Sequence, residues 1–373
     1  MSLEKSSIKS DAIKKGSPEP QNRTLGLLLG LALTLLLAIA AWWVTKQVYG
    51  VKDLALGIPG KVLEYPLWAA LLGLLGNAVL KAFKLHDKVR PGIRTELFLK
   101  VGLVLLGAGI NLTLLGTAAL GATLQGVIMI TSVFFFSYWL TGKFGLDDKL
   151  RAVMSTAISV CGVSAAIAAA GSVMAKKEQV TYVTTLVIIV ALPLMVLAPI
   201  LASAMNLPDA VAGAWFGGNI DTTAAVIGAG TIYSEQAQKV ASIVKNTQNA
   251  LIGVVAFLLA LYFATKDEAQ KGARPSPRII WDRFPKFVLG FVIASVLYSL
   301  GWIDGGKGTA IDAIKNWAFT LAFVSMGLEL SIGEFKRMGW RPVTVFLIVT
   351  VFNTLLALGV AYVIFQHLLP ISY

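Results

Sequence analysis

The 373-residue chain is 56% hydrophobic and only 14% charged, with a mean hydropathy of +0.75. This composition leaves no room for a soluble domain of any size. Repeated apolar runs of about 20 residues are typical of helices that cross a bilayer, whereas a transmembrane barrel would show short segments of alternating polarity. We therefore expect an all-α polytopic protein whose solvent is the lipid bilayer.

The formal net charge of +12 is concentrated in the connections between apolar segments. Of the 32 Lys and Arg residues, 23 lie in the N-terminal tail and in residues 81–100, 142–151, 266–286 and 333–342. Alternate connections carry these charges, as the positive-inside bias requires. The charge therefore predicts a cytoplasmic N-terminus and no nucleic-acid partner.

Residues 1–24 are polar and lack the cleavage site of a signal peptide, so we expect a disordered cytoplasmic tail. An extra first span follows within residues 25–49. The complete pattern predicts about eleven hydrophobic segments, at roughly 25–45, 66–83, 97–116, 121–141, 152–174, 180–204, 210–231, 238–265, 285–303, 312–332 and 342–368.

An internal repeat joins distant parts of the chain. Gly109–Leu114 (GINLTL) is similar to Gly327–Ile332 (GLELSI). The second to fourth segments therefore pair with the ninth to eleventh, and the two groups begin on opposite sides of the membrane. This pattern predicts an inverted-topology repeat with a first half at 62–205 and a second half at 208–373, a construction found in secondary transporters.

A shorter similarity relates Gly162–Ala166 (GVSAA) to Asp221–Ala225 (DTTAA). If both segments cross the membrane fully, this pair has parallel orientation and breaks the inversion. If both are re-entrant hairpins, one from each face, every similarity becomes inverted. Small-residue packing of ordinary helices is a third explanation, and the sequence leaves all three open.

The stretch from Trp215 to Asn249 places polar groups inside apolar sequence, which is costly at membrane depth unless they line a cavity or are buried in protein. At a broken helix end, backbone amides and hydroxyls would face an anion. The alternative for Asp221 is an ordinary helix cap at an interface. The candidate substrate-binding residues here are Gly217, Gly218, Asn219, Asp221, Thr222 and Thr223.

Two further charged residues are candidates. Lys245 shares a helical face with Gln248, and the pair could meet an anion directly, unless Lys245 snorkels to the interface. Glu329 is either a membrane-embedded coupling residue or the cytoplasmic end of its span. Asp221 and Glu329 are the candidates for binding a coupling ion.

The CGVSAA turn contributes Cys161, Gly162 and Ser164, because small residues permit close backbone approach and the hydroxyl can bind a ligand oxygen. One cysteine excludes an intrachain disulfide, and two histidines make a histidine-rich metal site unlikely to form. With no phosphate-binding loop and no catalytic triad, we expect no cofactor, no metal and no enzymatic activity.

The motifs CGVSAAIAAAG, FGGNIDTTAAVIGAG with VKNTQNALI, and GLELS together resemble the sulfate exporter family, the YeiH-like or UPF0324 membrane proteins. The resemblance covers the chain after its tail. It implies a bacterial inner-membrane transporter in which a core moves against a scaffold, often as a dimer. It also implies an arginine where this chain has Gln248, and losing that bidentate cation weakens the case for a doubly charged oxyanion.

The sequence thus predicts a secondary active transporter that moves a small anion, such as sulfate or a related sulfur or organic anion, by alternating access. Its partners would be the anion, the bilayer, a coupling proton or sodium ion, and a second copy in a homodimer. The alternatives are a monovalent cation/proton antiporter, an anion channel and a receptor that binds without transport.

Overall fold

The computed structural model describes residues 20–49, 65–266, 278–283, 286–303, 305–329 and 339–371. Every regular element in these ranges is helical, so the all-α prediction is confirmed for them. Residues 1–19 of the expected tail lie outside the described residues, and α2 already begins at Pro20. The helices are α2 (Pro20–Tyr49), α3 (Tyr65–Ala82), α4 (His86–Val89), η2 (Arg90–Gly92), α5 (Thr95–Gly107), α6 (Leu112–Lys143), α7 (Asp148–Ser159), α8 (Val163–Val173), α9 (Lys177–Ala204), α10 (Asp209–Asn219), α11 (Thr223–Tyr233), α12 (Glu235–Ala250), α13 (Ile252–Lys266), α14 (Arg278–Arg283), α15 (Phe287–Ser299), α16 (Gly305–Glu329), α18 (Trp340–Tyr362) and η5 (Val363–Leu368).

Among the described residues, six helices are long and apolar enough to span a membrane: α2, α3, α6, α9, α12 joined to α13, and α18. This is fewer than the eleven segments expected. The expected segment at 97–116 is divided, because α5 ends at Gly107 and α6 begins at Leu112. At 13 residues each, α5 and α15 are roughly 20 Å long, short of a hydrocarbon core of about 30 Å.

The expected segment at 152–174 is a helical hairpin made of α7 and α8. Asp147 caps the start of α7 by accepting from the backbone amide of Leu150 at 3.2 Å. Gln179, in the first turn of α9 just after α8, donates from Nε2 to Asp147 Oδ1 at 2.8 Å. The chain therefore enters and leaves this hairpin at the same end.

The expected segment at 210–231 is a second hairpin, made of α10 and α11. Tyr233 at the end of α11 donates its hydroxyl hydrogen bond to the carbonyl of Leu207, just before α10. Ser234 Oγ donates to Asp209 Oδ1 at 2.6 Å. These contacts hold the two outer ends of the hairpin together.

The packing of both arms against α12 gives their directions. A Cβ at Gly213 would meet Ala237, and one at Gly217 would meet Val244, so α10 runs parallel to α12. Gly230 instead meets Gln238. Because Asn249, eleven residues further along α12, contacts Thr223 at the start of α11, that helix runs antiparallel. The two arms are therefore antiparallel to each other.

The hairpins enter from opposite ends of α9. The α7–α8 hairpin joins α9 at its start, Lys177, and the α10–α11 hairpin follows its end, Ala204. A helix of 28 residues is about 42 Å long, enough to separate the two faces of a bilayer. Both segments are thus helical hairpins, as the re-entrant alternative requires, while re-entry itself and the inverted repeat with its halves, 62–205 and 208–373, stay predictions.

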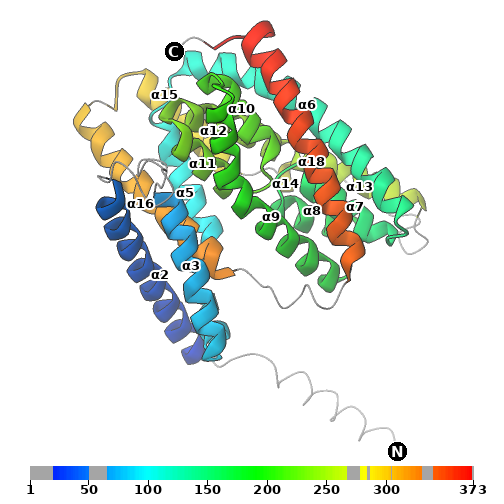
Figure 1. Ribbon diagram of the computed structural model, residues 1–373, viewed down its shortest axis with the longest axis horizontal. Coiled ribbons are helices and arrows are strands. Elements are labelled where there is room, and N and C mark those ends of the chain that lie inside the picture. The colour runs from blue at the N-terminus through cyan, green and yellow to red at the C-terminus, as the bar shows by residue number, and fades with distance from the viewer. Residues whose placement is uncertain are drawn as a thin grey trace, which may run out of the picture.

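The helices form two groups. Helices α2, α3, α5, α15 and α16 pack against one another, and we call them the scaffold group. Both hairpins, α6, α9, α12 and α18 form the hairpin group. Figure 1 shows α2, α3 and α16 along one flank, α6 and α18 along the opposite flank, and α10 to α12 between them. The polar residues at the hairpin tips therefore lie deep in the protein.

Candidate functional site

The tips of the two hairpins meet at Gly162 and Asp221. Gly162 has φ +68° and ψ −109°, a conformation that side chains with a Cβ rarely adopt. A Cβ there would lie 2.5 Å from Val187 Cγ1 on α9 and 3.4 Å from the carbonyl oxygen of Asp221. Glycine thus permits both the sharp reversal after α7 and the close approach of the second tip.

Lys245 of α12 lies behind this junction with its side chain buried. Its ammonium donates to the carbonyl of Val160 at 2.7 Å and to Gln248 Oε1 at 3.1 Å. Val160 is the C-cap of α7, where the helix dipole is negative and a cation is stabilising. The side chain therefore connects α12 to the tip of the first hairpin. Lys245 does not line either of the two cavities described below.

Asp221 lies just before Thr222, the N-cap of α11, and is 3% exposed. Among the residues that the structure describes, its Oδ2 has no hydrogen-bond partner, and neither does either polar atom of Asn246. Asp221 and Lys245 are both buried beside the tip but form no salt bridge with each other. Buried polar groups without partners are costly, so this pattern indicates a place where a proton, an ion or water completes the bonding.

The second tip is anchored from α18. The backbone carbonyl of Asn219 accepts a hydrogen bond from Asn353 Nδ2 at 2.9 Å. The side-chain Oδ1 of Asn219 accepts a second one from the Thr354 hydroxyl at 2.8 Å. Gly217 packs against Val244, and Gly218 against the amide of Gln125 on α6. These three predicted site residues, Asn219, Gly217 and Gly218, therefore face neighbouring helices.

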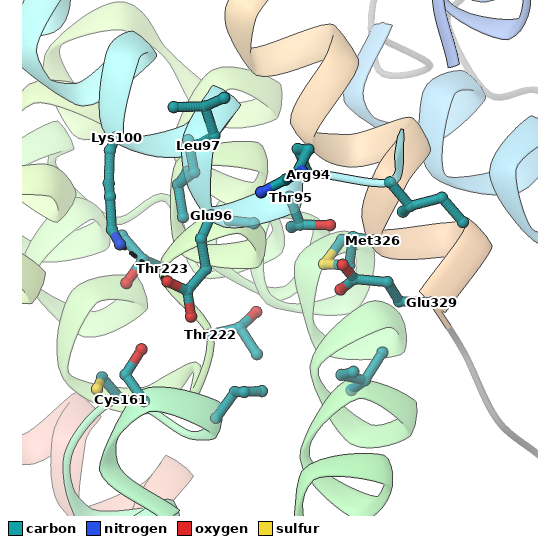
Figure 2. A pocket seen from close by; sticks show the side chains of 16 residues that line it. Arg94, Thr95, Glu96, Leu97, Lys100, Cys161, Thr222, Thr223, Met326 and Glu329 are labelled. Carbon is teal, nitrogen blue, oxygen red and sulfur yellow. Dashed lines mark hydrogen bonds and ion pairs between the residues drawn. The ribbon is translucent and has the colours of Figure 1, made fainter. Parts of the chain in front are cut away.

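A cavity of about 540 Å³ opens between the tips and the scaffold group. Figure 2 shows Cys161, Thr222 and Thr223 on one side, and α5 with Glu96 and Lys100 on the other. A second cavity of about 420 Å³ shares Cys161 and Thr223 with the first and also contains Asn249. We call these the first and second cavities.

The first cavity combines several groups that can bind an anion. No side chain caps α8 at Gly162, and the first amides of a helix lack intrahelical acceptors. Ser164 and Thr223 add hydroxyls, and two positive helix ends, those of α8 and α11, adjoin the same space. Of the residues predicted from sequence, Cys161, Ser164, Thr222, Thr223 and Glu329 line this cavity, Gly162 forms the tip beside it, and Asp221, Lys245, Gln248, Asn219, Gly217 and Gly218 lie behind it.

Glu329, the last residue of α16, lies where the first cavity adjoins a larger one. In Figure 2 its carboxylate points toward Thr95 and Met326. The neighbouring cavity, of about 820 Å³, also contains Glu329 and is lined by Lys81, Lys84, His86 and Arg90. A basic opening thus leads from the loop after α3 toward the hairpin tips.

Sequence reasoning missed the charges of α5. Glu96 and Lys100 form an ion pair with 2.8 Å between Oε2 and Nζ, and both line both cavities. In the sequence, Lys100 is the last basic residue of the predicted cytoplasmic connection at 81–100, so it does not stand out as a site residue. The available signal was an i, i+4 pair at the start of an apolar helix.

Six helices long and apolar enough to span a membrane, together with two helical hairpins, define the chain as a membrane protein. The family model described as conserved hypothetical protein 698 matches residues 29–346. The chain belongs to this family, that of the UPF0324 membrane proteins.

The curated relatives support the same assignment. A UPF0324 membrane protein of Rhodopirellula baltica is 36% identical over 89% of this chain and 62% of its own length, and one of Nitratidesulfovibrio vulgaris is 35% identical over 81% and 55%. This chain thus spans about three fifths of these first relatives. A UPF0324 membrane protein of Rhizobium meliloti is 26% identical over 92% of this chain and 94% of its own length. No solved structure matches the chain.

Proposed function

We propose that this protein is a secondary active transporter that moves a small anion across the bacterial inner membrane by alternating access, with its N-terminus in the cytoplasm. The observation that carries the proposal is the meeting of two hairpin tips, entering from opposite ends of α9, beside a polar cavity. Non-helical backbone at membrane depth is tolerated where it lines a cavity, and transporters bind substrates at such breaks.

An anion is the substrate class that the cavity favours. The N-termini of α8 and α11 present positive dipole ends, and Ser164, Thr222 and Thr223 offer hydroxyl donors. The basic cavity beside Glu329 would concentrate anions at the entrance. Sulfate or a related sulfur or organic anion is the first candidate, on the resemblance of the motifs alone.

Asp221 would bind the coupling proton or sodium ion, with Glu329 as a second coupling residue nearer the entrance. The support for Asp221 is its unpartnered, buried Oδ2 next to the first turn of α11. Lys245 would act as a positioning residue, because its ammonium is held by Val160 and Gln248. Movement of the hairpin group against the scaffold group would expose the tips to each side in turn.

The test is uptake of labelled sulfate into proteoliposomes, with phosphate and methanesulfonate as competitors. We expect saturable uptake that falls at least tenfold in Thr223→Val, which keeps the shape of the side chain and removes its hydroxyl. Thr117→Val on α6 is the matched control, because Thr117 is exposed and bonds only its own helix. Equal uptake by all three proteins would refute the site.

A monovalent cation/proton antiporter is the second candidate. The observation that favours it is the buried Asp221 carboxylate with Asn249, whose Oδ1 also lacks a partner. Carboxylate and amide oxygens are hard ligands suited to such a cation. Sodium flux driven by a pH gradient in the absence of any permeant anion, and lost in Asp221→Asn, would support this function over anion transport.

A further inference from the structure

We infer that Lys100 is a direct ligand of the transported anion and that Glu96 is a tethered carboxylate that takes the place of this anion when the site is empty. The inference rests on the proposed function, because it names residues for the same site. It differs from the sequence prediction, which assigned the cationic role to Lys245.

The position of the ion pair carries the inference. Glu96 and Lys100 project from α5 of the scaffold group toward the hairpin tips, and Figure 2 shows the Glu96 carboxylate directed toward Thr222, Thr223 and Cys161. Lys100 Nζ lies 2.8 Å from Glu96 Oε2. The Glu96 carboxylate thus lies between the threonine hydroxyls and the Lys100 ammonium. A small anion in the same place would accept hydrogen bonds from these groups.

Among the described residues, Glu96 and Lys100 are the two charged residues that line both cavities. Each of the other charged residues lines only one of the two cavities. Arg94 Nε donates to the carbonyl of Pro91 at 2.9 Å, and Glu329 lies at the entrance from the basic cavity. In the second cavity, Asp282 and Lys286 line the side toward α14 and α15.

Partner exchange gives the pair a function. An arriving anion would accept the hydrogen bond of Lys100, and Glu96 would swing into the water of the cavity; on departure Glu96 would return. Such exchange requires little desolvation, because the side chains of Lys100 and Glu96 are 48% and 57% exposed. Because α5 belongs to the scaffold group, Lys100 would contribute only while the tips face α5.

Cys161, the single cysteine, lines both cavities and is 6% exposed, so it provides a native reporter that small reagents reach only from the cavities. The first measurement compares its labelling rates with an anionic and a cationic methanethiosulfonate reagent of similar size, in the purified full-length protein. We expect Glu96→Gln to speed the anionic and slow the cationic reagent, and Lys100→Met to do the reverse. Each rate should change about fivefold, as for one unit charge across a partly hydrated cavity.

The second measurement uses sulfate, phosphate and methanesulfonate to protect Cys161 from a neutral methanethiosulfonate. Glu96→Gln should lower the half-protecting concentration at least fivefold, because the tethered competitor is gone. Lys100→Met should raise it at least tenfold. Opposite shifts from two residues in one ion pair are not expected if the pair only stabilises α5.

Glu235 and Lys239 on α12 provide matched controls, since they form an i, i+4 pair with the same 2.8 Å separation and line neither cavity. Glu235→Gln and Lys239→Met should leave both readouts unchanged. Charge-selective rates equal to wild type in Glu96→Gln and Lys100→Met would overturn the inference while leaving the proposed function intact. A wild-type Cys161 that reacts but that no anion protects would remove the proposed function and this role of Lys100 with it. If the buried Cys161 reacts too slowly to follow, Ser164→Cys, at an exposed residue that lines both cavities, gives the same readouts and the same two outcomes.

Discussion

Replacing Lys245 by methionine removes a buried cation while keeping most of the volume of its stem. The carbonyl of Val160 and the Oε1 of Gln248 each lose a charged donor, at 2.7 and 3.1 Å. Hydrogen bonds to charged groups are worth about 1.5–3 kcal/mol each, and this substitution removes two of them. We therefore expect Lys245→Met to lower the free energy of unfolding by about 3–5 kcal/mol.

The assay is a double-mutant cycle with Asp221→Asn, measured by equilibrium unfolding in mixed detergent micelles. Asp221→Asn alone should change the free energy of unfolding much less, because Lys245 keeps both hydrogen bonds. In the double variant no buried carboxylate is left without its cation. The double variant should therefore be more stable than the sum of single effects predicts, by about 1–3 kcal/mol.

Lys239→Met is the control, since Lys239 pairs with the largely exposed Glu235 and such pairs contribute at most about 1 kcal/mol. Additive effects of Asp221→Asn and Lys245→Met would refute the electrostatic link across the tip. A Lys245→Met variant as stable as Lys239→Met would refute the role of Lys245 in holding the first hairpin.

Substitutions at three further positions test the hairpins, each read as the free energy of unfolding in the same micelles. Gly162→Ala should cost about 1–3 kcal/mol, because of its positive φ and the contact with Val187; a neutral effect would contradict the tip geometry. Gly217→Ala should cost about 1–3 kcal/mol, since its Cβ would lie 2.7 Å from Val244 Cβ, and stabilisation would show that α10 and α12 are further apart. Ser234→Ala should cost about 1 kcal/mol by uncapping α12, whereas Ser234→Asp, which repels Asp209, should not rescue it.

The positions of the hairpin tips could be predicted from the sequence, because short local motifs mark them. Small residues around Gly162 and polar residues around Asp221 break apolar sequence at the positions where the helices end. The choice between crossing and re-entry depended on contacts between residues distant in sequence. The hydrogen bond between Asp147 and Gln179 shows that the chain turns back, and the hydrophobic periodicity of the segment does not predict this contact.

The partners of the buried charges were beyond sequence reasoning for the same reason. Lys245 looks like a substrate ligand in a polar stretch, and its partner Gln248 lies on the predicted helical face, yet its shorter hydrogen bond goes to a backbone carbonyl 85 positions away. Every residue has such a carbonyl, so no residue type marks it. Glu96 and Lys100 have the opposite problem, since an i, i+4 pair near a basic loop resembles an ordinary solvated helix end.

Counterflow is the most direct test of the central claim that the two hairpin tips form the site of a carrier. Proteoliposomes loaded with excess unlabelled sulfate are diluted into labelled sulfate, with Thr223→Val and Thr117→Val beside the wild type. The account predicts transient accumulation of label above equilibrium in wild type and Thr117→Val, and its loss in Thr223→Val. Label that only equilibrates, at a rate proportional to concentration, would indicate a channel and contradict the account.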